Sequence, residues 1–149
     1  MTYTNRFAEE VVPLAYFQPG QRNPQTEASG WINVENYHRL ACVIQVGAMD
    51  ALATLTVNVQ EASDAAGTGA ATITGKTDTL TQAGGDANQA PAVIEVRGEE
   101  LSNDGVVKYE YVRLQAVTAV NNVNYSIILY GVPQRYLPTA ATAWNGITD

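Results

Sequence analysis

The residues of this chain that could perform acid–base or nucleophilic chemistry are few. His38 is the single histidine and Cys42 the single cysteine among 149 residues. A Ser–His–Asp triad would need His38 as its base, with a nucleophile and an orienting carboxylate beside it. No G-x-S-x-G nucleophile elbow occurs in the sequence. We therefore interpret His38 as a structural hydrogen-bonding residue at the start of a strand.

Cys42 alternates in phase with Leu40 and Ile44. A free cysteine in such a position behaves as a small buried hydrophobic residue. No neighbouring group that would lower its pKa, and so activate the thiol, is evident in the sequence. One histidine and one cysteine do not complete a structural zinc site by nitrogen and sulfur ligands alone. The sequence therefore predicts no enzymatic activity, no catalytic residue, no metal and no cofactor.

Charge excludes a further class of function. The chain holds 8 Lys and Arg against 15 Asp and Glu, a net charge of −7, and charged residues make up only 15% of it. The basic residues are scattered singly, whereas nucleic-acid binders normally show a basic patch. No signal peptide or membrane-length apolar run is visible. We expect no nucleic-acid partner and no membrane partner, and a surface poor in charge that suits contact with other proteins.

The elements that must position these residues are strands. From Gly30 onward apolar and polar residues alternate, and Thr54–Gln60 places Leu55, Val57 and Val59 on one face. Short alternating segments with turn signals between them, such as Asp104-Gly105, indicate an all-β fold. We predict an antiparallel β-sandwich, jelly-roll-like, over residues 30–137. Its core is predicted to contain Leu55, Val57, Ile94, Leu114, Ile127 and Leu129.

The two ends of the chain are predicted to form extended arms. Residues 1–29 contain Pro13, Pro19 and Pro24 and show little periodicity, and residues 138–149 are rich in Ala and Thr. Both carry apolar side chains that a partner is expected to cover. Deletion of residues 1–20 is accordingly expected to leave a folded sandwich that has lost its assembly contacts. The predicted interface comprises Phe7, Val11, Val12, Leu14, Tyr16, Phe17, Trp31, Tyr109, Tyr111, Tyr136 and Trp144; for Tyr109 and Tyr111 an extension of the core is an equal alternative.

Residues 26–138 contain a succession of short segments: Thr26–Ile32, Tyr37–Arg39, Val57–Gly69, Ile94–Leu101 and Gly131–Tyr136. This succession resembles the small β-sandwich head decoration, or cement, proteins of tailed bacteriophages. The resemblance implies a protein made in the cytoplasm of a bacterial host that binds the outside of the capsid shell. Its partners would be the major capsid protein, whose subunit joints it stabilises, and further copies of itself in a homotrimer or homodimer. No catalytic residues are carried over.

Two other functions fit the same residues. The chain could be another structural part of the virion, in the tail, the collar or the base of a head fibre. It could also be a phage sugar-binding module, in which Trp31, Tyr109 and Tyr111 form a stacking platform for a glycan.

Overall fold

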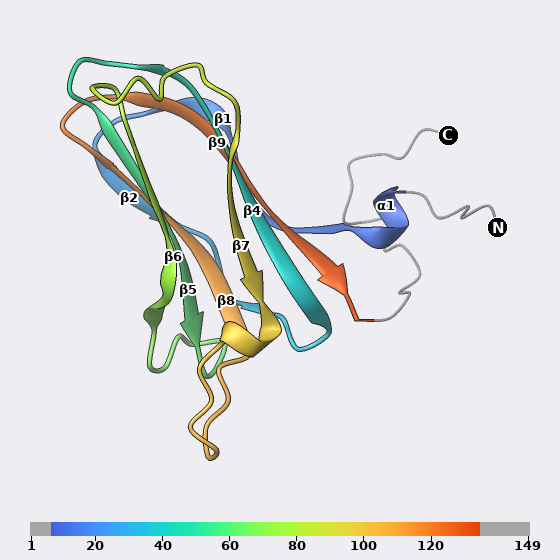
Figure 1. Ribbon diagram of the computed structural model, residues 1–149. Coiled ribbons are helices and arrows are strands. Elements are labelled where there is room, and N and C mark those ends of the chain that lie inside the picture. Colours follow the sequence, from blue (N-terminus) through green and yellow to red (C-terminus); the bar gives the residue numbers. More distant parts are fainter. Residues whose placement is uncertain (1–6, 135–149) are drawn as a thin grey trace.

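The computed structural model describes residues 7–134, and most of them lie in β-strands (Figure 1). A short helix precedes the first strand, and a single 3-10 turn follows the seventh. The elements are α1 (Phe7–Glu10), β1 (Val12–Arg22), β2 (Gln25–Ala28), β3 (Ile32–Asn33), β4 (Tyr37–Met49), β5 (Thr54–Ala62), β6 (Ala71–Thr81), β7 (Ala92–Arg97), η1 (Gly98–Glu100), β8 (Tyr111–Ala119) and β9 (Val123–Pro133).

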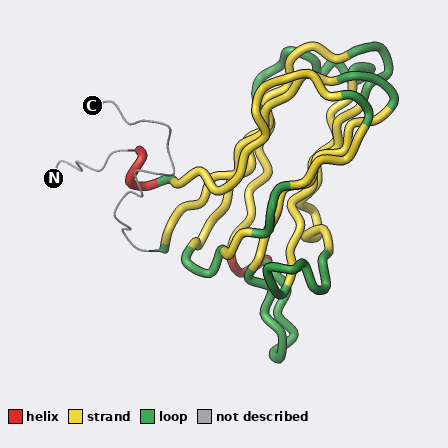
Figure 2. Tube along the Cα trace, turned by 180° about the vertical axis from the view of Figure 1, so that it is seen from behind, coloured by secondary structure: helices red, strands yellow, loops and turns green. Residues whose placement is uncertain are grey.

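The strands form two antiparallel sheets that pack face to face (Figure 2). Sheet A has the order β1-β9-β4-β7, and sheet B has the order β2-β8-β5-β6. The short β3 pairs with β8 beyond the end of β2, so β2 and β3 share one edge position of sheet B. Apart from the β5–β6 hairpin, consecutive strand positions alternate between the sheets. This order is that of a jelly roll, and it confirms the predicted fold class.

The core lies between the inner faces of the two sheets. Alternate residues of each strand point inward, so β5 contributes Leu55, Val57 and Val59, as its sequence pattern predicts. All members of the predicted core are buried, which confirms the register assigned from the sequence. They are Leu55, Val57, Ile94, Leu114, Ile127 and Leu129.

Truncation of one core side chain is expected to destabilise the fold strongly. Ile127→Ala removes a fully buried side chain of β9 and should lower the free energy of unfolding by about 2–5 kcal/mol. Ser126→Ala changes the preceding residue, which points to the opposite face of the same strand, and should change the free energy of unfolding by less than about 0.5 kcal/mol. Denaturant unfolding of both variants measures the difference. Equal stabilities would contradict the inward placement of Ile127.

The prediction of a separate N-terminal arm is wrong for residues 12–28. They form the edge strand β1 of sheet A and the edge strand β2 of sheet B. Ala15 pairs with Leu129 and Phe17 with Ile127, and the side chains of Ala15 and Phe17 are buried in the core. Pro13 and Pro19 concealed this strand in the sequence. An edge strand tolerates proline because one side of it needs no hydrogen-bond donor, and the register of β1 shifts near both prolines.

The predicted C-terminal arm falls on residues that the structure does not describe. Tyr136, Trp144 and the expected arm 138–149 lie outside the described residues. Strand β8 of sheet B begins at Tyr111. The residues before it, from 102 to 109, form a hairpin of their own that projects from the end of the sandwich (Figure 1).

Three of the sheet edges carry features that disfavour pairing with another chain. β1 contains Pro13 and Pro19, and Pro91 directly precedes β7. On β6 the register shifts over a stretch that contains Gly75, whose φ is +75°. The next residue, Lys76, forms an ion pair at 2.8 Å with Glu100 of η1. Bulges, prolines and charges of this kind are how natural sheets block strand addition. These three edges are therefore poorly suited to pairing with a further strand.

Candidate interaction surfaces

The outer face of sheet A carries a row of apolar side chains that crosses all four strands. Tyr16 pairs with Ile128, Ile128 with Val43, and Val43 with Val93, so the four side chains lie side by side. At the two edges Tyr16 is 63% exposed and Val93 is 54% exposed. Val43 and Ile128 are half-buried between them. We call these four residues the apolar row.

The surroundings of the apolar row have the layout of a protein–protein interface. On one side the next rank contains Tyr130, Ala41 and the charged Glu95 in register, and Arg39 opposite Arg97 follows. On the other side the rank is polar and uncharged, with Gln45 opposite Ser126. An apolar centre bordered by polar and charged side chains is the usual anatomy of such an interface.

The outer face of sheet B is different, because its polar side chains bond to one another. The hydroxyls of Thr56 and Thr79 are 3.1 Å apart. Asn58 Nδ2 donates to Gln115 Oε1 at 3.1 Å, and Arg113 Nε donates to Gln60 Oε1 at 2.7 Å. This hydroxyl and amide ladder satisfies its own hydrogen bonds at a water-facing surface. The two outer faces of the sandwich therefore differ, because sheet A carries an apolar row with a polar and charged border and sheet B carries a hydrogen-bonded polar ladder.

The predicted aromatic platform is partly covered by the chain itself. The guanidinium carbon of Arg113 lies 4.5 Å from the centre of the Trp31 ring, a cation–π contact. A Cβ atom at Gly67, where φ is +86°, would lie only 2.5 Å from Trp31 Nε1, and one at Gly69 would lie 2.8 Å from the Tyr109 hydroxyl. The loop that holds both glycines therefore rests against Trp31 and Tyr109. Together with Tyr111, these aromatics are half-buried.

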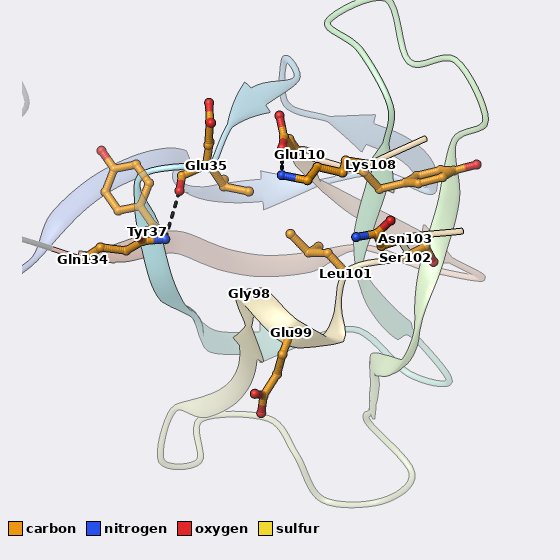
Figure 3. A pocket seen from close by; sticks show the side chains of 12 residues that line it. Glu35, Tyr37, Gly98, Glu99, Leu101, Ser102, Asn103, Lys108, Glu110 and Gln134 are labelled. Atoms are coloured by element: carbon orange, nitrogen blue, oxygen red, sulfur yellow. Dashed lines mark hydrogen bonds and ion pairs between the residues drawn. The ribbon is translucent and has the colours of Figure 1, made fainter. Parts of the chain in front are cut away.

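A hollow of about 320 Å³ opens at the end of the sandwich that carries the 102–109 hairpin (Figure 3). Tyr37, Leu101 and Tyr109 contribute apolar surface to it. Two of its charged side chains pair with each other, since Lys108 Nζ lies 3.4 Å from Glu110 Oε1. Burial raises the pKa of the Tyr37 phenol. The volume suits a single small side chain or ligand more than an extended polymer.

A buried carboxylate, Glu61, was missed by the sequence analysis. It ends the inward series Leu55, Val57 and Val59 on β5 and is buried. Both the amide, at 2.8 Å, and the hydroxyl of Ser102 donate to its carboxylate oxygens, so the polar group is satisfied. The alternation of β5 contained the signal, because it directs residue 61 to the same side as residues 55, 57 and 59.

A second polar tie joins the two sheets near the end of β1. Tyr125 of β9 donates its hydroxyl proton to Glu27 of β2 at 2.9 Å, and Arg22 pairs with the same carboxylate oxygen at 3.1 Å. Burial, followed by the adjacent Glu27 carboxylate, raises the pKa of Tyr125 to about 12. The phenol therefore stays protonated at neutral pH and serves as a hydrogen-bond donor between the sheets.

His38 and Cys42 lie in different environments, one exposed and one buried. His38 is exposed, and its Nδ1 lies 3.1 Å from the carbonyl oxygen of Pro133. Cys42 is fully buried, as predicted. Within residues 7–134 no group of three or more His, Cys, Asp or Glu side chains lies close enough together to hold a metal ion. In the same range, no helix has the length and apolar character needed to cross a membrane.

Cys42 is expected to be chemically inert in the folded protein. Burial raises the pKa of its thiol to about 12, so almost no reactive thiolate forms at mildly alkaline pH. A colorimetric disulfide reagent should label the thiol fast in denaturant and at least about a hundredfold more slowly without it. Fast labelling of the native protein would contradict the buried position on β4.

The predicted interface residues differ in how exposed their side chains are. Phe17 is buried and Leu14 packs against the core, so neither is available to a partner, and this part of the prediction is wrong. Val11 and Val12 are half-buried, whereas Phe7 and Tyr16 are exposed. The sequence analysis missed Val43, Val93 and Ile128. Each is an apolar residue out of phase with its own buried strand neighbours, and that was the only available signal.

Comparisons with known proteins give fold likenesses alone. No protein-family model matches the chain, and no curated protein matches it. Among solved structures, a chain of the native virion of Kashmir bee virus at neutral pH is similar, with a TM-score of 0.44 and 11% identity, over 92% of this chain and 80% of that one. A chain from Bacillus endospore appendages, described as a novel family of disulfide-linked pili, has a TM-score of 0.36 and 11% identity, over 89% and 100%.

Proposed function

We propose that this chain is a capsid decoration protein of a tailed bacteriophage. It binds the outside of the shell and stabilises the joints between major capsid subunits, and it performs no catalytic step. The observation that carries the proposal is the apolar row of Tyr16, Val43, Val93 and Ile128 across the outer face of sheet A. The sequence resemblance supplies the identity of the partner.

The contrast between the two faces supports one-sided attachment. A row of four neighbouring apolar side chains, two of them more than half exposed, is the kind of patch that a partner covers. The ladder of Thr, Asn and Gln on sheet B forms its own hydrogen bonds and suits the side that remains in water. In this arrangement sheet A lies on the shell and sheet B faces the medium.

The mechanism is burial of surface across joints that are repeated by the symmetry of the shell. Each bound copy, arranged with others as a homotrimer or homodimer, adds interface free energy at one joint. Symmetry multiplies that contribution over the whole particle. The blocked edges of β1, β6 and β7 also fit this mode, because they disfavour open-ended strand addition and leave a face as the means of attachment.

The proposal is tested by adding the protein to shells purified from a phage that lacks this gene. The added protein should sediment with the shells, saturate at a fixed number of copies, and raise the temperature at which the shells open. Absence of binding to both unexpanded and expanded shells would overturn the proposal. Binding to isolated tails would instead identify another virion part, and binding to host-surface glycans without shells would identify a sugar-binding module.

A further inference from the structure

The hairpin of residues 102–109 exposes apolar side chains at its tip. Asn103 and Lys108 form the bridge that closes it, and Asp104-Gly105 begins the turn. Val106 is 91% exposed and Val107 is 39% exposed. The hairpin projects beyond the sandwich between η1 and β8 (Figure 1). Two adjacent exposed valines therefore lie in the projecting loop that the Asn103–Lys108 bridge closes.

The tip is held in one conformation by its own side chains. Asp104 Oδ1 accepts hydrogen bonds from the amides of Val106 at 2.9 Å and Val107 at 2.6 Å. Asn103 Oδ1 accepts one from the Gly105 amide at 2.9 Å, and Gly105 has a φ of +84°, which glycine adopts without strain. The hydrogen bonds to Val107 and Val106 hold the pKa of Asp104 below its usual range.

The base of the hairpin is tied to the core. Ser102 donates from both its amide and its hydroxyl to the buried Glu61 carboxylate. The amide of Tyr109 in turn donates to the Ser102 carbonyl at 3.0 Å. The hairpin is thus fixed at its tip and at its base. A binding element that is already ordered avoids the conformational entropy loss that a flexible loop incurs on binding.

We propose that this hairpin is a second attachment point, a preformed apolar knob that enters a small pocket of a neighbouring capsid subunit. This inference rests on the proposed function. The knob lies at the end of the sandwich and not on the outer face of sheet A, so it reaches beyond the footprint of the apolar row. A copy that holds one subunit with sheet A and the next with the knob spans the joint between them.

The chemistry of the tip favours a pocket on a protein as its binding site. Only Val106 and Val107 are apolar, and they lie between the charged Asp104 and Lys108. Two valines bury too little surface to anchor the chain in a lipid layer. One lysine beside one aspartate offers nothing that would attract a phosphate backbone. An apolar pocket with a polar rim accepts the valines and leaves both charges in water.

The test compares shell binding of wild type, V106S/V107S and the control Leu52→Asn. Leu52 is also an exposed apolar residue, 66% exposed, and it lies at the opposite end of β4 from the hairpin. The double variant should melt like wild type and bind shells about ten- to hundredfold more weakly. The Leu52→Asn variant should bind as wild type does. Unchanged binding of the folded double variant would overturn the knob while leaving the proposed function intact.

A photo-crosslinking residue in place of Val106 identifies directly the molecule that the hairpin contacts. We expect a crosslink to the major capsid subunit on irradiation of decorated shells. A crosslink to a second copy of this chain, or none in shells that carry the protein, would overturn the inference. Failure of the wild-type protein to bind shells at all would overturn the proposed function and the knob together.

Discussion

Deletion of residues 1–20 is expected to destroy the fold. The deletion removes most of β1, takes Ala15 and Phe17 out of the core, and leaves β9 as an unprotected edge. Loss of the Phe17 side chain alone costs about 3–5 kcal/mol, and small domains have only about 5–15 kcal/mol in total. Circular dichroism and thermal melting of the purified variant should show no cooperative transition.

Two neighbouring point variants provide the matched control for that deletion. Phe17→Ala should lower the free energy of unfolding by about 3–5 kcal/mol, because its side chain points into the core. Tyr16→Ala, on the exposed side of the same strand, should change it by less than about 1 kcal/mol. A cooperative transition in the deletion variant near that of wild type would restore the arm as the correct description of this segment.

Replacement of Ile128 by glutamate is expected to abolish shell binding. Ile128 lies in the middle of the apolar row, between Tyr16 and Val43, and an unpaired carboxylate buried there would cost several kcal/mol. The affinity should fall by more than about a hundredfold. The milder Val43→Thr keeps the shape of the side chain and should weaken binding about five- to tenfold. Quantitative sedimentation with shells, after a melting curve for each variant, measures both.

Thr79→Glu is the control on the other face. Thr79 is exposed on the outer face of sheet B, so its replacement adds the same charge to a surface that is expected to stay in water. Its binding should equal that of wild type. If Thr79→Glu lost binding while Ile128→Glu kept it, the shell would be held by sheet B.

Local patterns explain why the sequence alone predicted much of the fold. Alternation on β4 and β5 identified Cys42, Leu55 and Val57 as inward residues, and each is buried. The Asp104-Gly105 turn signal falls inside the loop that the Asn103–Lys108 bridge closes. Period-two alternation is a property of each strand by itself, so it is visible without knowledge of the partner strand.

Features that depend on long-range pairing could not be predicted in the same way. Phe17 belongs to the core only because β1 pairs with β9, more than a hundred residues later. The apolar row exists because four separate segments place Tyr16, Ile128, Val43 and Val93 in one register. Each of these residues looks like an isolated exposed apolar side chain in the sequence, and such residues are common on protein surfaces. Only the strand order joins them into one surface.

Cryo-electron microscopy of a shell saturated with the protein shows directly which face of the sandwich binds. We expect density for the jelly roll on the outer surface of the shell, at joints between major capsid subunits. Sheet A should lie against the shell, with Val43 and Ile128 at the contact. The hydroxyl and amide ladder of sheet B, which includes Thr56 and Thr79, should face the solvent. Density in which the apolar row faces the solvent, or in which the protein occupies the tail and not the shell, would contradict it.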